Sequence, residues 1–485
     1  MASVATERVT LGSVGNRNHL WAFGIVGVLS LLTIVAYSKH EYYIYLAAYM
    51  WFGFVYGMCL QYGRFCFSSA FRDLFAVGVP RMAVGIMIAM VLFGLVSAFV
   101  TATGNSTFHA APYGWHAVIA GVVFGVGMVL TGGCASGSLY KAGEGNVTAM
   151  LVVVSISTSL AIFADIGGWL NALVPYSWHQ SALSKGLPAA ITVGDGWLDQ
   201  YLAGYVWNQP ILTYSEWLGL EGPWVSAFVS NVLVGIVLPA SLLLVIAYVI
   251  WYRKGYLRKR AEEGKTQKGF ATELIGYWSM IAASKRTAIA GLILGIAAGL
   301  HMYVMKGMQL KFGVQNFGAI MKELGYTAGL SYKDTVFDPG YWYVTTQEAQ
   351  WVGWVFNKLG VDNTSNIFFG LENGLPNPLL NPAGWMSFAL IAGAAVMALL
   401  NNEFKWKNTT PELAMWAIIG GALMGIGSRL GLGCNVGAFF VRVSQGDVSG
   451  WLFGIGMIGG AYIGVKFFNW WTERKMAKEM AACGL

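Results

Sequence analysis

The sequence predicts an all-α polytopic membrane protein with about ten transmembrane helices. Its 485 residues are 56% hydrophobic and only 11% charged, whereas about a quarter of the residues in a soluble domain carry charge. The mean hydropathy is +0.56, and apolar stretches long enough to cross a hydrocarbon core of ~30 Å recur along the whole chain. This composition excludes a soluble enzyme and a nucleic-acid-binding protein, and it makes the lipid bilayer the surrounding medium.

Short polar breaks separate the apolar stretches into ten predicted spans. No small-residue cleavage site follows the first stretch, so we expect an uncleaved helix rather than a signal peptide. The predicted spans are residues 20–38, 41–60, 78–102, 114–131, 147–170, 224–252, 286–304, 383–400, 411–430 and 448–471.

The distribution of basic residues predicts the orientation of these spans. Lys and Arg are frequent in residues 253–287, whereas residues 171–222 contain only Lys185. By the positive-inside rule, the first segment is cytoplasmic and the second is external. Counting spans from this point places both termini in the cytoplasm.

Seven segments follow from this organisation. Two of them are external insertions rich in Trp and Tyr, which we expect to lie along the membrane interface and cap the outer face rather than capture substrate. The segments are a cytoplasmic N-terminal stretch (1–19), a first transmembrane repeat (20–170), an external insertion (171–222), a connecting helix with a basic cytoplasmic loop (223–285), a second transmembrane repeat (286–472) that contains another external insertion (304–382), and a cytoplasmic tail (473–485).

An internal duplication relates the two halves of the chain. GVVFGVGMVLTGGCASG at 121–137 aligns with GALMGIGSRLGLGCNVG at 421–437, and seven of the seventeen positions are identical. The helices before these two motifs run in opposite directions in the predicted topology. The sequence therefore predicts an inverted repeat, an arrangement in which transporters place the substrate site near the midplane at the repeat interface. The GxxxG pairs at 53–57, 121–125, 291–295 and 421–425 are expected to serve helix packing.

Three cysteines lie at polar, glycine-containing breaks, in YGRFCF, TGGCASG and GLGCNVG. Each break is expected to start a short re-entrant helix, because non-helical backbone at membrane depth must line a protein-walled cavity. The N-terminus of a restarted helix offers unpaired N–H groups and a positive dipole end to an anion, and glycine permits close approach. The candidate pathway residues are Cys66, Cys134, Cys434, Gly63, Gly133 and Gly433.

The thiols suit a sulfur-containing anion. An S–H group is a weak hydrogen-bond donor, and a thiolate is a nucleophile toward an S–S bond. We favour neutral thiols that hand the anion along by weak hydrogen bonds, with a transient covalent persulfide as the alternative. Cys59, in mid-helix, is expected to be a buried apolar residue.

Charged residues near the breaks complete the candidate site. Charges inside a membrane are functional candidates by default, and the positive-inside rule does not account for Arg429 and Arg442, which fall in an outward-facing motif. The remaining candidates are Arg64, Lys141 and Glu144. The His and Cys spacings predict no metal site, and no Walker or dinucleotide-binding motif predicts a cofactor.

The motifs YGRFCF, TGGCASGSLYKAGEGN and GLGCNVG together resemble the YeeE/YedE family of bacterial inner-membrane sulfur-compound permeases. The resemblance implies a permease, not an enzyme, with an hourglass of helices and short inward hairpins. It implies that thiosulfate or a related anion passes along Cys66, Cys134 and Cys434 to a small cytoplasmic TusA-like sulfurtransferase. Leu432 stands where the family has Gly. Transport of selenium compounds, a sulfur-transfer or redox protein that forms persulfides, and a subunit that anchors a partner are the alternatives.

Overall fold

The computed structural model describes residues 4–104, 115–165, 219, 222–265, 269–314, 320, 322–325, 340, 342, 344–361 and 378–483. Within these ranges the regular elements are helices, and strand pairing is limited to one isolated bridge between Asn146 and Lys407. The predicted all-α class is therefore confirmed. Most of the insertion 171–222, and most of 304–382 after α16, fall outside the described residues.

The first half of the chain forms a series of helices broken at the cysteine motifs. These are α1 (Val4–Tyr37), α2 (Glu41–Gly63), α3 (Phe67–Val77), α4 (Arg81–Ala102), α5 (Trp115–Leu130), α6 (Ala135–Gly143) and α7 (Val147–Asp165). A long, nearly continuous helix then comprises α12 (Pro223–Val225), η2 (Ser226–Val237), α13 (Leu238–Ala247), η3 (Tyr248–Tyr252) and α14 (Arg253–Glu262), and α15 (Phe270–Ile281) follows it.

The second half repeats the alternation of long and short helices. It contains α16 (Lys285–Lys311), α18 (Val344–Lys358), η4 (Pro378–Leu380), α19 (Pro382–Leu400), α20 (Pro411–Leu430), η5 (Asn435–Val441), α21 (Arg442–Ser444) and α22 (Val448–Cys483). Asn381 and Thr410 cap the starts of α19 and α20, and each is followed by proline at the first helical position, where the missing N–H costs no hydrogen bond.

The predicted spans match the described helices closely. Nine described segments are long and apolar enough to cross a membrane, and the tenth predicted span is present as the shorter apolar helix Val147–Phe163. The nine are Arg17–Tyr37, Glu41–Val77, Arg81–Ala102, Ala117–Gly143, Pro223–Glu262, Lys285–Lys311, Pro382–Leu400, Pro411–Leu430 and Val448–Ala481.

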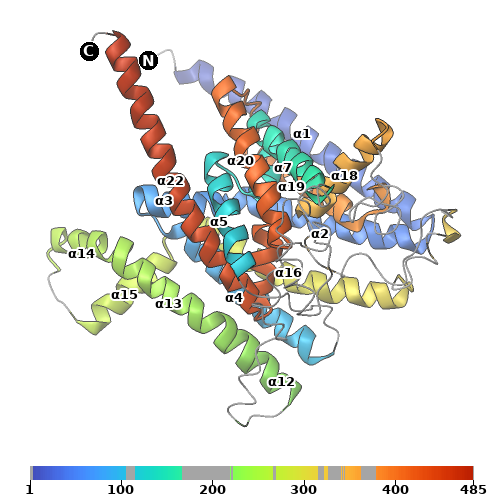
Figure 1. Cartoon of the computed structure of the whole chain (residues 1–485), viewed down its shortest axis with the longest axis horizontal. Coiled ribbons are helices and arrows are strands. Elements are labelled where there is room, and N and C mark those ends of the chain that lie inside the picture. The colour runs from blue at the N-terminus through green and yellow to red at the C-terminus, as the bar shows by residue number, and fades with distance from the viewer. Residues whose placement is uncertain are drawn as a thin grey trace, which may run out of the picture.

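Helices from the first half pack mainly against helices from the second half. The main pairs are α2 with α19, α5 with α22, α7 with α20 and α4 with α16 (Figure 1). Glycines permit these crossings, as the GxxxG pairs predicted. A Cβ on Gly291 would lie 2.7 Å from the Gly85 carbonyl oxygen, and one on Gly295 would lie 2.5 Å from that of Ala89. Small residues thus bring helix backbones together where lipid tails cannot drive association.

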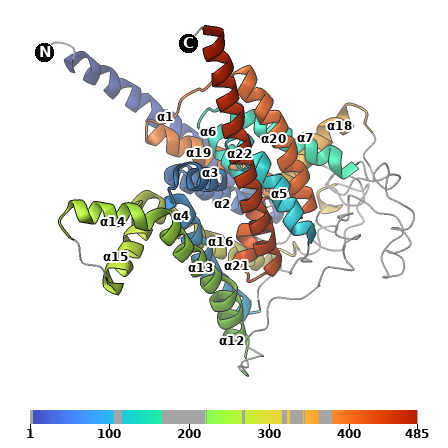
Figure 2. The same cartoon turned by 60° about the vertical axis from the view of Figure 1, so that its left-hand side comes forward.

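The start of α1 and the end of α22 lie toward the same end of the bundle in both views (Figures 1 and 2). The segment 253–287, expected to be a basic loop, instead folds largely into α14, α15 and the start of α16. The side chain of Arg253 donates to Glu273 at 2.7 Å and joins α14 to α15. This ion pair is half-exposed, so it orients the two helices more than it stabilises them.

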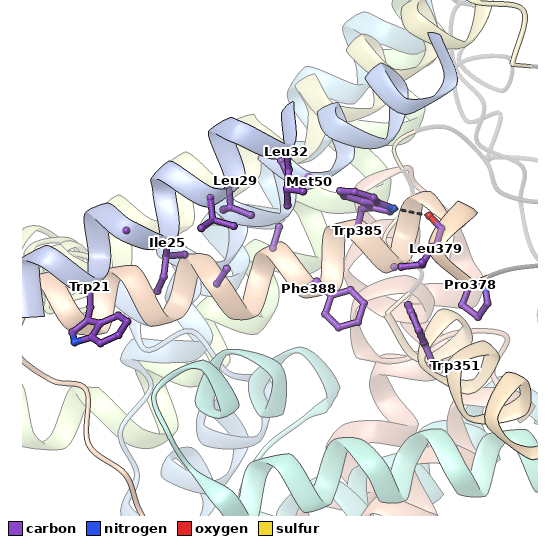
Figure 3. A pocket seen from close by; sticks show the side chains of 15 residues that line it. Trp21, Ile25, Leu29, Leu32, Met50, Trp351, Pro378, Leu379, Trp385 and Phe388 are labelled. Atoms are coloured by element: carbon purple, nitrogen blue, oxygen red, sulfur yellow. Dashed lines mark hydrogen bonds between the residues drawn. The ribbon is translucent and has the colours of Figure 1, made fainter. Parts of the chain in front are cut away.

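An apolar groove of about 600 Å³ runs between α1 and α19 (Figure 3). Trp21, Ile25 and Phe388 are among the side chains that line it, and Trp385 donates its indole N–H to the Leu379 carbonyl at 2.7 Å. None of the three break cysteines lines this groove. It belongs to the apolar outer surface and is separate from the candidate site.

Candidate functional site

The three cysteine breaks share one local geometry. Each cysteine is the N-cap residue of a short helix, namely α3, α6 or η5. The residue two positions before each cysteine has the left-handed backbone conformation, with φ of 55° at Arg64, 66° at Gly132 and 53° at Leu432. A chain turned in this way ends one helix and starts the next in a new direction. The predicted helix breaks are therefore present at Cys66, Cys134 and Cys434.

Cys66 and Cys134 form a direct pair of buried thiols. Their Sγ atoms lie 3.7 Å apart, and both residues are fully buried. The Cys134 Sγ also accepts from the Gly137 N–H at 3.3 Å and lies 3.6 Å from the Ser136 Oγ. The first two breaks therefore meet at one point, where the Gly137 N–H in the first turn of α6 is directed at the Cys134 thiol.

The Cys434 break contacts the first two through aromatic side chains. Cys434 is 2% exposed, and its Sγ accepts from the Val436 N–H at 3.4 Å. The ring of Phe67, next to Cys66, lies 5.8 Å from that of Phe439 and 6.4 Å from that of Phe440, measured between centroids. All three cysteines belong to one buried core cluster.

Two of the predicted cations hold the breaks in place. Lys141 donates to the Gly132 carbonyl at 2.6 Å, and Arg442 donates to the carbonyls of Gly431 and Leu432 at 3.2 and 3.1 Å. In both halves a cation thus binds the carbonyl of the left-handed residue two positions before the cysteine. These charge-assisted bonds satisfy carbonyls that the helix ends leave unpaired, and the ammonium group of Lys141 adds positive charge near the Cys66 thiol.

The predicted glycines serve different contacts. A Cβ on Gly133 would lie 3.0 Å from the Ser138 Oγ, and one on Gly433, whose φ is 153°, would lie 2.8 Å from the Ala438 nitrogen. Both glycines therefore allow the helix restart to fold tightly. Gly63 packs against the Ala290 side chain of α16, a helix-packing contact, so its role in a pathway stays a prediction.

A polar cluster surrounds Arg64 beside the first break. Arg64 lies 3.0 Å from Glu403 and 3.7 Å from Glu144, and Gln61 donates to Glu403 at 2.8 Å. Burial works to raise the pKa of Glu403, but the hydrogen bond from Gln61 and two guanidinium groups outweigh it and hold the pKa below its usual value. Burial raises the pKa of Glu144, which Arg64 opposes. The cluster joins both halves of the chain.

The remaining predicted cation, Arg429, lies in the last turn of α20 and is 7% exposed.

Part of the insertion 304–382 enters the core instead of lying on the membrane surface. Trp342 is 3% exposed, and its ring centroid lies 3.7 Å from that of Tyr56 and 6.3 Å from that of Phe440. The Gly340 N–H donates to the Tyr49 hydroxyl at 2.7 Å. A Cβ on Gly437 would lie 3.8 Å from the Trp342 carbonyl oxygen, so this segment reaches the Cys434 break.

Comparison with known proteins assigns the chain to a family. The profile of the family described as Sulphur transport matches residues 62–463. The chain belongs to the Sulphur transport family. This confirms the resemblance read from the motifs around Cys66, Cys134 and Cys434, because the matched range includes all three.

The relatives to which this chain is similar are named as transporters. It is 28% identical to the thiosulfate transporter TsuA of Spirochaeta thermophila over 414 residues, which cover 82% of this chain and 92% of the relative. It is 31% identical to the thiosulfate transporter TsuA of Escherichia coli over 136 residues, or 27% and 39% of the two chains. It is 37% identical to the probable transporter YedE of Escherichia coli over 128 residues, or 26% and 32%.

Three further residues at or near the candidate site were not predicted from the sequence. Gly137 faces the thiol pair, because a Cβ there would lie 2.5 Å from the Cys66 Sγ and 3.0 Å from the Cys134 Sγ. Its identity with Gly437 in the repeat alignment was the available signal. Trp342 and Glu348 are 3% and 6% exposed, but they belong to the insertion 304–382, whose many Trp and Tyr residues are typical of a membrane interface and gave no sign of burial.

Substitution of Gly132 tests the left-handed turn that precedes Cys134. Nothing lies within 4 Å of a Cβ placed on Gly132, so a side chain there meets only the backbone penalty of positive φ, roughly 1–2 kcal/mol. We expect Gly132→Val to lower the thermal unfolding midpoint in detergent. Gly132→Asn should lower it less, because Asn tolerates this conformation. Equal midpoints for the two variants would contradict the prediction.

Proposed function

We propose that this protein is an inner-membrane permease that takes up thiosulfate or a related sulfur-containing anion along Cys66, Cys134 and Cys434. The observation that carries the proposal is the pair of buried thiols 3.7 Å apart at the N-termini of two short helices. The family described as Sulphur transport and the relatives named thiosulfate transporters support this substrate class.

The breaks supply what a sulfur anion needs at membrane depth. The short helices act as re-entrant hairpins in an inverted repeat, and each presents helix N-terminal N–H groups to the pathway. Lys141 and Arg442 add positive charge that attracts the anion from water. Neutral thiols donate weak S–H hydrogen bonds, which hold the anion without trapping it. Passage from Cys434 to the Cys66–Cys134 pair then follows the line of the three breaks.

The orientation follows from the distribution of basic residues. Both termini and the α14–α15 segment face the cytoplasm, so the Arg64 cluster forms the inner mouth of the pathway and the Trp342 segment closes the outer one. A small TusA-like sulfurtransferase at the inner mouth would receive the anion. The guanidinium of Arg64 is half-exposed, so it can bind the anion at the inner mouth before the anion passes to the sulfurtransferase.

Uptake by the purified chain tests the function. We expect proteoliposomes containing the full chain to accumulate ³⁵S-labelled thiosulfate. Excess unlabelled thiosulfate should compete, and excess sulfate, which lacks a sulfane sulfur, should compete weakly. Entry at the rate of protein-free liposomes would contradict the proposal. A panel of selenium oxyanions in the same assay separates the sulfur substrate from the selenium alternative.

The thiol pair also favours one second candidate, a covalent sulfur transfer. A Cys66 thiolate would attack the sulfane sulfur of thiosulfate, forming a cysteine persulfide and releasing sulfite. Intact mass after exposure to thiosulfate would then show one added sulfur atom per chain. An unchanged mass during uptake excludes this candidate.

A further inference from the structure

Glu348 is a buried carboxyl group on α18, in the segment that reaches the Cys434 break. The residue is 6% exposed, and neither carboxylate oxygen has a hydrogen-bond partner among the described residues. A carboxylate taken out of water without a partner carries a large penalty, which protonation removes. The position therefore favours a neutral carboxylic acid.

The elements around α18 supply little charge to this carboxyl. α18 packs against α7, α19, η4 and α6. The described part of α7, Val147–Phe163, carries no ionisable side chain, and neither α19 nor η4 carries one. On α6, the ionisable groups are Tyr140 and Lys141, and Lys141 is bonded to the Gly132 carbonyl.

Of the three break cysteines, Cys434 is the one whose thiol the charge of Glu348 affects. Burial raises the pKa of the Cys434 thiol to about 11, and the negative charge of an ionised Glu348 acts in the same direction. The cations of this hairpin are Arg429 at the end of α20 and Arg442 after η5, and the guanidinium of Arg442 is bonded to backbone carbonyls of the break. An anion bound at Cys434 would therefore interact electrostatically with the carboxyl group of Glu348.

An anion at Cys434 and a proton on Glu348 favour each other. Burial raises the pKa of Glu348 well above its usual range, and a nearby anion disfavours the ionised carboxylate further. Conversely, an ionised Glu348 repels an anion at Cys434. By linkage, each ligand strengthens the binding of the other by the same factor.

We propose that Glu348 is a proton-binding site of the transport cycle, so that a proton enters with each sulfur anion that passes Cys434. The proton comes from the outer water, binds the carboxylate as the anion arrives, and leaves toward the cytoplasm after the anion moves to the Cys66–Cys134 pair. This inference rests on the proposed function. It couples uptake to the proton gradient, and one proton offsets one of the two charges of a dianion whose entry the interior-negative membrane potential opposes.

Paired measurements on proteoliposomes of the full chain test the inference. Entry of ³⁵S-labelled thiosulfate is measured together with the fluorescence of a trapped pH indicator, at external pH values from 5 to 8. For the unsubstituted chain we expect thiosulfate to acidify the lumen, and uptake to fall as external pH rises and the acid form of Glu348 is lost.

Glu348→Gln keeps the shape of the neutral carboxyl but cannot release a proton. We expect it to retain exchange of labelled for unlabelled thiosulfate, to reduce lumen acidification by at least tenfold, and to remove the pH dependence of exchange. Glu323→Gln is the matched control, because Glu323 is an exposed acid of the same insertion, 64% exposed and paired with His40. It should behave like the unsubstituted chain in all three readouts.

The outcomes separate this inference from the proposed function. Thiosulfate entry without acidification in the unsubstituted chain, or equal acidification in Glu348→Gln, overturns the proton site alone. Loss of exchange in Glu348→Gln with a normal unfolding midpoint also overturns it, because the carboxyl would then act in binding rather than in proton release. No thiosulfate entry by the unsubstituted chain overturns the proposed function and the proton site with it.

Discussion

Replacing Cys134 with alanine is expected to reduce thiosulfate uptake roughly 10- to 100-fold, the effect of losing a hydrogen bond of ~1.5–3 kcal/mol to a charged group. The Cys134 thiol is paired with Cys66 at 3.7 Å and accepts from the N–H of Gly137, so its loss removes a donor to the anion and disturbs its partner thiol. Initial rates of labelled thiosulfate uptake measure the effect.

Two controls make the cysteine prediction decisive. Cys59→Ala removes a buried thiol near the C-terminal end of α2 and should leave uptake close to normal. Cys134→Ser keeps a hydroxyl donor and a cap on α6, so it should retain part of the uptake, because the proposed pathway holds the anion by hydrogen bonds. Normal uptake by Cys134→Ala contradicts the thiol pathway.

Gly137→Ala is expected to reduce uptake by a comparable factor with little change in the global fold. The added methyl group would lie 2.5 Å from the Cys66 Sγ and 3.0 Å from the Cys134 Sγ, well inside van der Waals contact. The thiols must move apart or turn away, and the space beside them is lost. Uptake rates and the unfolding midpoint in detergent together measure the change.

The counterpart position in the second half provides the matched variant. A Cβ on Gly437 meets its nearest neighbour, the Trp342 carbonyl oxygen, at 3.8 Å, an ordinary contact. Gly437→Ala should therefore leave uptake close to normal, although it makes the same chemical change on the opposite hairpin. Equal losses in Gly137→Ala and Gly437→Ala would show that the methyl group acts on the helix restarts in general and not on the thiol pair.

The spans and the cysteine breaks could be predicted from the sequence because both depend on local composition. Apolar runs of bilayer length identify the helices, and glycine beside a polar stretch marks each break. The left-handed turn at Leu432 could not be predicted in the same way. Leucine rarely adopts positive φ, and the Arg442 bonds that satisfy the carbonyls there come from a residue ten positions later. The inverted repeat and the re-entrant depth of the hairpins stay predictions.

The position of the external segment could not be predicted because tertiary packing decides it. The sequence VTTQEAQWVGWVFNK of α18 mixes polar and aromatic residues in the manner of an interfacial helix. Its burial depends on contact with α7 and α19, and that of Trp342 depends on Tyr56 of α2 and Phe440 of η5. No local signal at 340–350 reports such distant partners, so the burial of Glu348 could not be predicted from the sequence.

The pairing of α2 with α19, α5 with α22, α7 with α20 and α4 with α16 limits the kinds of motion open to this protein. The two halves are interleaved rather than set side by side, so a rocking separation of one half from the other would pull apart the backbone contacts made by residues such as Gly291 and Gly295. Under the proposed function, we expect the anion to move through small shifts of the short segments at the three cysteines. Transport of this kind depends on a narrow constriction and not on a large movement of one half of the protein against the other.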